Sequence, residues 1–309
     1  MTTSIYHEGE RAVQRAAGEV AIADQNGVVI TATILGGARP FLHKQFMAVL
    51  ASVDAQGMPW SSVLWGEPGF VQVDGASALA IAMPPDRRDP LDPLWDNIAA
   101  NPAIGMLFIE LGSRRRYRIN GSVQGLDEEG LRIVVREAYP NCPRYIQRRH
   151  LRAIDGESQP ALLDEGGALQ GSARDIIRRA DTVFVASSHA QAGADVSHRG
   201  GNPGFVQLLG EGRLRLPDYP GNSLFNTFGN LSVDPRVGLC IPDFDGQRLL
   251  QLCGRARILF DQPDPGGLSA GTGRFWEIDV ERWLLRCMPR RLDWEYLDAS
   301  PFNPDILEP

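Results

Sequence analysis

One short stretch of the chain gathers residue types that could bind an anion. It reads Asp195-Val196-Ser197-His198-Arg199-Gly200-Gly201. Arginine pairs with phosphate through a rigid fork of N–H donors, and successive glycine N–H groups can line an anion-binding concavity. The stretch is poor in strand-forming residues, so we expect a loop, with an arginine that points into water as the alternative. The candidate binding residues here are Asp195, Ser197, His198, Arg199, Gly200 and Gly201.

Polar residues elsewhere could complete such a site. Four of them, at close to helical spacing, follow a Pro-Gly break: Asn222, Asn226, Thr227 and Asn230. Arg87 and Arg88 precede an earlier predicted helix, and a helix N-terminus favours phosphate through its free N–H groups and its dipole. We add all six to the candidate site. For the two arginines, a solvated charged loop is the alternative, and for the run Arg114-Arg115-Arg116 a solvated turn is the favoured interpretation.

The chain carries one pattern of residues twice. Ala51-Ser52 and Pro68–Gln72 recur as Ala186-Ser187 and Pro203–Gln207, offset by 135 positions. A second set recurs with an offset of 133: Pro84, Asn97, Pro102, Gly105 and Gly121 match Pro217, Asn230, Pro235, Gly238 and Gly254. This predicts one fold present twice, over about 40–125 and 178–262. A duplicated domain can form within one chain the two-fold interface that relatives form by dimerising.

Each copy is predicted to be a small, mostly antiparallel barrel. In the first copy the strands are expected at 46–53, 59–64, 70–73, 79–83, 104–111 and 117–123, with a helix at 91–101. Outside this unit we expect helices at 8–17, 128–139 and 144–154, and strands at 28–34 and 275–285. The predicted domains are 1–155, an N-terminal extension plus the first barrel, and 175–309, the second barrel with a C-terminal extension. A linker rich in glycine and acidic residues is expected at 156–174.

Composition excludes several classes of protein. The net charge of −7 argues against a nucleic-acid binder, and no apolar run is long enough to span a membrane. The polar start lacks the apolar stretch of a signal peptide, so we expect a cytoplasmic protein. The four cysteines form no C-x-x-C pair and the five histidines no H-x-x-x-H pair, so no metal site is expected.

The motifs around the candidate site resemble those of a known family. They are Asp195–Val206, Pro217–Asn222, Asn226, Asn230 and Asp234–Leu239. Together they are similar to the pyridoxamine 5′-phosphate oxidase-like FMN-binding split-barrel family, in its tandem-duplicated, flavin-nucleotide-binding form. The resemblance implies a mainly β fold with some α (α+β): two tandem six-stranded antiparallel split β-barrels with peripheral helices, docked as an internal pseudo-dimer. A homodimer of the whole chain is a further option.

The resemblance also implies a cofactor and an activity. FMN would lie between the barrels, with its phosphate or ribityl groups on Ser197, Arg199 and the Gly200-Gly201 backbone. Asn222, Thr227 and Asn230 would line the groove, and the first copy could offer Arg87, Arg88 or Trp65. We therefore predict an FMN-dependent oxidoreductase that acts on an unknown small molecule, with NAD(P)H as a candidate electron donor. Arg282 and Arg286 do not reproduce the phosphate-binding set of true pyridoxamine phosphate oxidases, so the vitamin B6 reaction is not expected.

Two other functions are compatible with the sequence. One is a non-catalytic protein that binds or senses flavin or haem, with His198 or His189 as the haem ligand. The other is a cofactor-free scaffold that presents Trp60 and Trp65 to a partner. The apolar run Trp60–Trp65 occupies the position of Asp195–Gly200 in the first copy. We therefore expect the corresponding groove to have become structural.

Overall fold

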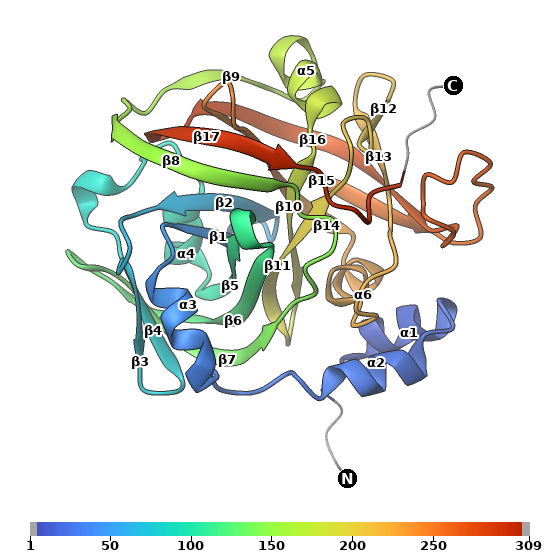
Figure 1. The fold of residues 1–309 in the computed structure, drawn as a ribbon, viewed down its shortest axis with the longest axis horizontal. Coiled ribbons are helices and arrows are strands. Elements are labelled where there is room, and N and C mark those ends of the chain that lie inside the picture. Colours follow the sequence, from blue (N-terminus) through green and yellow to red (C-terminus); the bar gives the residue numbers. More distant parts are fainter. Residues whose placement is uncertain (1–4, 305–309) are drawn as a thin grey trace.

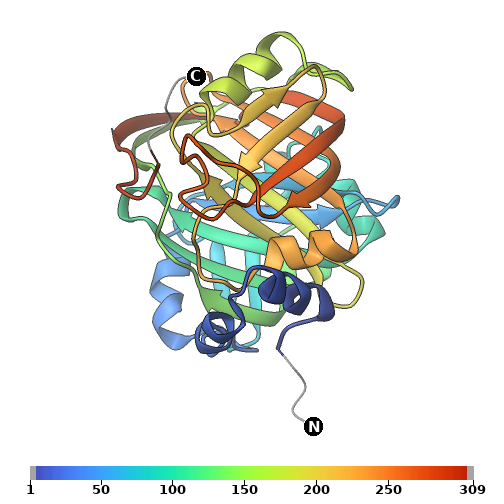
Figure 2. The ribbon, with the colours of Figure 1, turned by 90° about the vertical axis from the view of Figure 1, so that its right-hand side faces the viewer.

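The computed structural model of the protein describes residues 5–304, apart from the side chains of residues 155 and 157. Strands dominate, and the helices lie at the periphery (Figures 1 and 2). The described residues contain no helix long and apolar enough to cross a membrane. The predicted mainly β fold with some helix is therefore confirmed.

The first half of the chain forms a seven-stranded antiparallel sheet in the order β2-β1-β5-β6-β7-β4-β3. Its strands are β1 (Met47–Val53), β2 (Pro59–Trp65), β3 (Val71–Asp74), β4 (Ala78–Ala82), β5 (Ala103–Glu110), β6 (Arg115–Leu126) and β7 (Gly130–Pro140). The helix α4 (Leu94–Ala100) connects β4 to β5, as the sequence predicts.

The second half forms a sheet whose central strands follow the same order, β11-β10-β14-β15-β16-β13-β12. Its strands are β10 (Thr182–His189), β11 (Gly193–Gly200), β12 (Gln207–Leu209), β13 (Arg213–Pro217), β14 (Arg236–Asp243), β15 (Arg248–Leu259) and β16 (Phe275–Cys287). The helix α6 (Asn226–Val233) occupies the place of α4, and β9 (Leu162–Gly166) adds to the sheet beside β16.

The remaining elements tie the two halves together. A ribbon of β8 (Arg148–Glu157) and β17 (Arg290–Asp298) runs through the upper part of the molecule in Figure 1, below β9 and α5. The N-terminal helix α1 (Glu8–Ala16) lies against α6 of the second half, and α2 (Val20–Gly27) lies against α1. The short helices are α3 (Arg39–His43) and α5 (Gly171–Arg179), with 3₁₀ turns η1 (Gly36–Ala38), η2 (Pro85–Arg87) and η3 (Leu111–Ser113).

Three apolar cores hold this arrangement. One lies inside each sheet, around Leu50 and Met106 in the first half and around Leu239 and Trp276 in the second. The third lies between the halves, where β1, β2 and β5 meet β10, β11 and β14. Because strands buried on both faces contribute to two cores at once, β1 and β2 are buried along their whole length.

Two glycines of the repeated pattern lie where the halves approach most closely. A Cβ on Gly105 would lie 2.7 Å from the Cα of Asp195, and one on Gly238 would lie 2.9 Å from the Cα of Trp60. Asp195 and Trp60 are themselves equivalent positions of the repeat. The recurrence of these glycines is therefore explained by close backbone contact between β5 and β11 and between β14 and β2.

Several predictions of individual elements were wrong. The predicted helix at 128–139 is the strand β7, in which buried Leu131, Ile133 and Val135 alternate with exposed neighbours, so the true period is two. It adds a seventh strand to the predicted six. The predicted helix at 144–154 is largely the strand β8, which pairs with β17 far along the chain.

Two further predictions failed because tertiary pairing decided the outcome. The predicted loop at 195–201 is mostly the strand β11, which pairs with β10 without interruption from Gly193 to Gly200. The predicted strand at 28–34 makes only one bridge, from Thr31 to Ala138, and the helix α2 precedes it. The proposed linker at 156–174 contains β9 and the start of α5, and the domain boundaries stay a prediction.

We predict that Gly105→Ala lowers the free energy of unfolding by about 1–3 kcal/mol, because the added methyl overpacks a backbone contact. Gly238→Ala should do the same. Gly212→Ala is the control, since no atom of the described residues lies within 4 Å of the Cβ that it would add. Urea unfolding of the three variants measures the effect. Equal unfolding midpoints for Gly105→Ala and Gly212→Ala would contradict the proposed contact.

Candidate functional site

An arginine-rich pocket, here called the arginine pocket, opens where β6 of the first half faces β11 of the second. Its volume is about 100 Å³. Strand β6 contributes Arg116 and Arg118, and β11 contributes His198 and Arg199. The rest of its wall comes from the segment after β7, the loop before α6 and Arg274: Asn141, Cys142, Arg144, Tyr145, Gly200, Asp218, Tyr219, Gly221, Asn222, Ser223 and Phe225.

The arginine pocket has an excess of positive charge. Arg118 forms an ion pair with Asp195 at 3.1 Å, and Arg274 forms one with Asp218 at 2.9 Å. Within residues 5–304, the other three arginines, Arg116, Arg144 and Arg199, have no carboxylate at ion-pair distance. Arg116 instead donates from Nε to the carbonyl of Cys142 at 2.6 Å. Such a cluster favours an anionic ligand, and phosphate matches the guanidinium fork.

Several shielded polar atoms at this pocket have no partner among the described residues. They are Nε of Arg118, Nε of Arg199, both ring nitrogens of His198 and the hydroxyl of Tyr219. Buried polar groups are nearly always hydrogen-bonded, so unpaired ones at a cavity indicate a missing ligand or solvent. Most of these atoms are donors, which again fits an acceptor-rich anion.

Burial and mutual repulsion lower the pKa values of His198, Arg116 and Arg199. Burial lowers the pKa of His198 well below its usual value, and the charges of Arg116, Arg199 and Arg149 lower it further. Burial also lowers the pKa of Arg199, and with repulsion from Arg118 it lowers the pKa of Arg116 to about 9. A bound anion would oppose each of these shifts, since it would stabilise the charged forms.

A buried hydrogen-bond network lies behind the arginine pocket and joins the two sheets. Arg118 donates to Ser197 at 2.8 Å and to Asn226 at 3.2 Å, in addition to its pair with Asp195. The hydroxyls of Ser197 and Thr227 are 2.7 Å apart. Four of the predicted residues, Asp195, Ser197, Asn226 and Thr227, therefore contact Arg118 or its partners.

Asn230 lies away from the arginine pocket, in a cavity of about 480 Å³ beside α1. Its amide nitrogen donates to Ser187 at 3.0 Å, and its amide oxygen lies 3.0 Å from Nε2 of His7. Asn97 makes the same bond to Ser52, also at 3.0 Å, at the equivalent place in the first half. In each half, the matching asparagine thus connects a helix to a strand by a hydrogen bond: α6 to β10, and α4 to β1.

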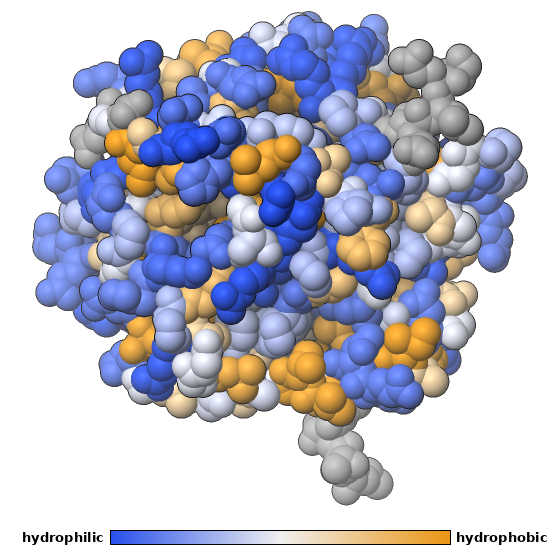
Figure 3. All heavy atoms as spheres, viewed as in Figure 1, coloured by the Kyte–Doolittle hydropathy of each residue, from blue (hydrophilic) through white to orange (hydrophobic). Residues whose placement is uncertain are grey.

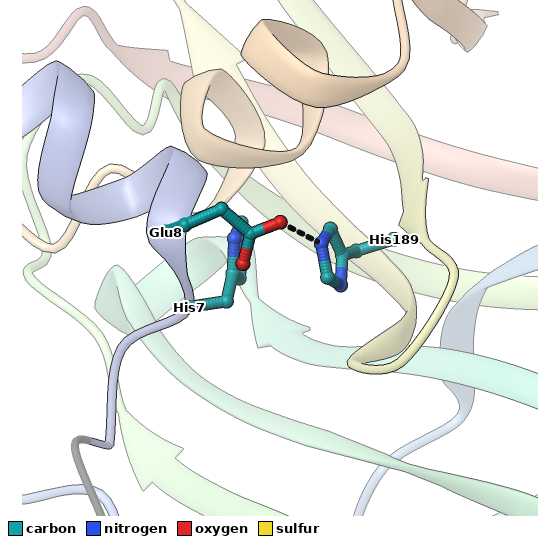
Figure 4. A group of neighbouring side chains, drawn as sticks. All are labelled: His7, Glu8 and His189. Carbon is teal, nitrogen blue, oxygen red and sulfur yellow. Dashed lines mark hydrogen bonds and ion pairs between the residues drawn. The ribbon is translucent and has the colours of Figure 1, made fainter.

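His7, Glu8 and His189 meet at the mouth of the same cavity, with their ligand-type atoms within 4.8 Å of one another (Figure 4). The two rings stack with centroids 4.1 Å apart, and Nε2 of His189 lies 3.1 Å from Glu8. In both rings Nδ1 accepts a backbone N–H, from Gly9 in one and from Ala192 in the other. A histidine that binds a metal through Nε2 normally donates a hydrogen bond from Nδ1, and neither ring does so here. We therefore interpret the cluster as a structural contact that holds α1 in place.

Arg87 and Arg88 lie in a third cavity, of about 260 Å³, which we call the tryptophan pocket. It is also lined by Trp65, Trp95, Leu249 and Arg286. Its β2 and β15 residues are the repeat equivalents of the β11 and β6 residues that line the arginine pocket. The candidate residues are therefore split between cavities: His198, Arg199, Gly200 and Asn222 line the arginine pocket, whereas Arg87 and Arg88 do not.

Gly201 lies just behind the arginine pocket. A Cβ there would lie 3.0 Å from the hydroxyl of Tyr219. Sequence reasoning missed Arg116, Arg118, Asp218 and Arg274, and it placed Arg116 in a solvated turn. The available signal was the spacing of Arg116 and Arg118, because residues two apart on a strand share one face.

An apolar groove of about 460 Å³ adjoins the arginine pocket and shares Arg116 and Asn141 with it. Its walls include Leu35, Phe41 and Tyr117. The polar pocket and this groove together offer a charged end and an apolar end to one ligand.

We predict that His198→Phe weakens the dependence of stability on pH. The unfolded chain takes up a proton at His198 near pH 6.5, whereas the folded chain resists it, so acid destabilises the fold from about pH 6.5 downward. Relative to the variant, the original protein should lose about 1 kcal/mol or more per pH unit in that range.

Urea unfolding of both proteins from about pH 7.5 to about pH 5.5 measures this difference. Glu10, whose pKa burial raises to about 7, acts in the opposite direction, but it is present in both proteins and cancels. Parallel stability curves would show that His198 is not held neutral.

Three solved structures each match part of the chain at low sequence identity. HupZ from Group A Streptococcus is 13% identical, covers 41% of this chain and 93% of its own, and has a TM-score of 0.28. HutZ, the heme storage protein from Vibrio cholerae, is 13% identical, covers 44% and 96%, and has a TM-score of 0.26. A Clostridium acetobutylicum protein related to general stress protein 26 (pyridoxinephosphate oxidase family) is 11% identical, covers 41% and 92%, and has a TM-score of 0.27.

Likenesses at this level carry no information on activity, and no curated protein matches the chain. A family model described as pyridoxamine 5'-phosphate oxidase matches residues 36–152. These residues include all seven strands of the first sheet. Residues 36–152 are therefore similar to the pyridoxamine 5′-phosphate oxidase family.

Proposed function

We propose that the protein binds FMN through the arginine pocket and acts as an FMN-dependent oxidoreductase on a small molecule. The observation that carries the proposal is the cluster of Arg116, Arg144 and Arg199, which lack carboxylate partners in the described chain. The phosphate of a flavin nucleotide is a dianion with acceptor oxygens, so it matches both the charge and the unpaired donors.

The size of the cavities supports a divided binding mode. A pocket of about 100 Å³ admits a phosphate group, whereas ligand sites for whole cofactors are typically about 300–1,000 Å³. The adjoining apolar groove of about 460 Å³ is large enough for a ring system. In this proposal the phosphate lies against Arg116 and Arg199, and the flavin ring lies toward Phe41 and Tyr117.

FMN would supply the redox chemistry, accepting a hydride from a donor such as NAD(P)H and passing electrons to the substrate. The chain's own residues would bind and orient it. Arg199 would neutralise the phosphate, and His198 would line the pocket beside it. Asp195, Ser197, Asn226 and Thr227 would act through Arg118, by fixing the position of its guanidinium.

We further infer that the molecule is two copies of one split barrel, docked as an internal pseudo-dimer over 1–155 and 175–309. The shared strand order, the paired glycine contacts and the equivalent Asn–Ser bonds support it. A homodimer of the whole chain and a cytoplasmic location stay predictions.

The two alternative functions have less support. For haem, His189 has both ring nitrogens hydrogen-bonded, and the cavity beside His198 is far smaller than a porphyrin. For a scaffold, Trp60 and Trp65 are only 3% and 4% exposed, so they form no docking surface. On the face viewed in Figure 3, apolar residues lie in small groups between hydrophilic ones.

We predict that the purified protein binds FMN and that Arg199→Ala weakens binding about tenfold to a hundredfold, as expected for a lost charge-assisted bond. Quenching of flavin fluorescence during titration measures the affinity. Arg255→Ala is the matched control, because Arg255 is exposed and pairs with Glu281 outside every cavity described here.

Circular dichroism of both variants checks that they fold. Folded protein that leaves the flavin spectrum unchanged would refute the proposal. Equal affinities for Arg199→Ala and Arg255→Ala would refute the assignment of the arginine pocket.

A further inference from the structure

Two tryptophans that line the tryptophan pocket have shielded hydrogen-bond donors. Trp65 and Trp95 both line this cavity, and the indole N–H group of neither has an acceptor within the described part of the chain. Trp65 is 4% exposed, and its ring packs edge-on against Trp294. Because a buried indole N–H usually finds an acceptor, two unpaired ones around one cavity point to a ligand.

The charges of the tryptophan pocket, unlike those of the arginine pocket, are largely balanced from within. Arg286 is 1% exposed and forms ion pairs with Asp89 and, at 2.7 Å, with Asp92. Arg290 pairs with Glu67. Arg88 donates from Nε to the carbonyl of Met83 at 2.9 Å and lies over the ring of Trp95.

The difference in charge between the two pockets comes from positions that match in the repeated sequence pattern. Val63 and Leu64 on β2 stand where His198 and Arg199 stand on β11, and Leu249 on β15 stands where Arg116 stands on β6. The cavity has thus exchanged unpaired cations for apolar walls. Among the described residues, Arg87 and Arg88 have no carboxylate partner at this cavity, but the guanidinium of Arg88 donates to the carbonyls of Met83 and Asp127. Arg87 alone is left for a phosphate, so the cavity suits a phosphorylated cofactor less well than the arginine pocket does.

We propose that the tryptophan pocket is a second ligand site, which binds a planar aromatic molecule of one or two rings carrying carbonyl acceptors. The indole N–H groups of Trp65 and Trp95 donate to the carbonyl oxygens, and Leu64, Leu249 and Met83 contact the rings. The volume of about 260 Å³ lies just below the range typical of drug-sized ligands and suits a molecule smaller than a flavin. The site is independent of the proposed FMN site.

The probe for this site is 2,3-dimethyl-1,4-naphthoquinone. It is neutral, planar and has two carbonyl oxygens, and its methyl groups block addition of cysteine thiols. The protein is labelled with ¹⁵N at its six tryptophan indoles, and the indole N–H signals are recorded during titration. Single Trp→Phe variants assign the signals.

We expect the Trp65 and Trp95 signals to shift with saturation, while that of Trp283 stays in place because its N–H already donates to Ala168. Trp95→Phe and Trp65→Phe should each weaken binding about threefold to tenfold, the effect of one lost hydrogen bond. Trp276→Phe is the matched control, since this indole is also unpaired but lines none of the cavities described here. It should leave the affinity unchanged.

The probe 2,3-dimethylnaphthalene tests the role of the carbonyl groups, because it has the same rings without acceptors. Weaker binding by about tenfold or more is expected for it. Absence of saturable shifts at Trp65 and Trp95, or equal affinity for the two probes, would overturn the proposal. Saturating FMN should not displace the quinone, and displacement would show that the two sites are not separate.

Discussion

The buried pair of Arg118 and Asp195 is the interaction on which the rest of the structure depends. Arg118 belongs to β6 of the first sheet and Asp195 to β11 of the second, and both are almost fully buried. An ion removed from water must keep its partner, and loss of one member of such a pair typically costs about 3–5 kcal/mol. Separation of the two sheets would therefore expose one of these charges to water or leave it buried without its partner. Because the arginine pocket is lined from both sheets, the candidate site exists only while they are docked.

The two grooves between the halves differ in chemistry, although positions that match in the repeated sequence pattern line both of them. In the tryptophan pocket, Asp89 and Asp92 neutralise Arg286, and aliphatic side chains occupy the β2 and β15 positions. In the arginine pocket, the corresponding strands present Arg116, His198 and Arg199. The neutral state of His198 avoids a further charge there. The difference in charge between the two pockets thus depends on a few positions on corresponding strands.

Much of the fold could be predicted from the sequence. The strands β1 to β6 and the helix before β5 follow from local periodicity. The strands β7, β8 and β11 were missed or misassigned because their partners are distant in sequence, and pairing overrode propensity. His198 and Arg199 were identified by residue type. Arg286 and its aspartates could not be grouped in advance, because Asp89 and Arg286 are joined only by the docking of the two sheets.

The central claim is that one of the two equivalent grooves binds a phosphate dianion and the other does not. Phosphorus NMR of the FMN-loaded protein tests it most directly. The account predicts one bound resonance, with an intensity of one phosphate per chain. When the pH is lowered past the second phosphate pKa of about 6, this resonance should keep the chemical shift of the dianion. Unpaired arginines would hold the phosphate in that form. Two bound resonances of equal intensity, or a bound phosphate that titrates like the free one, would contradict it.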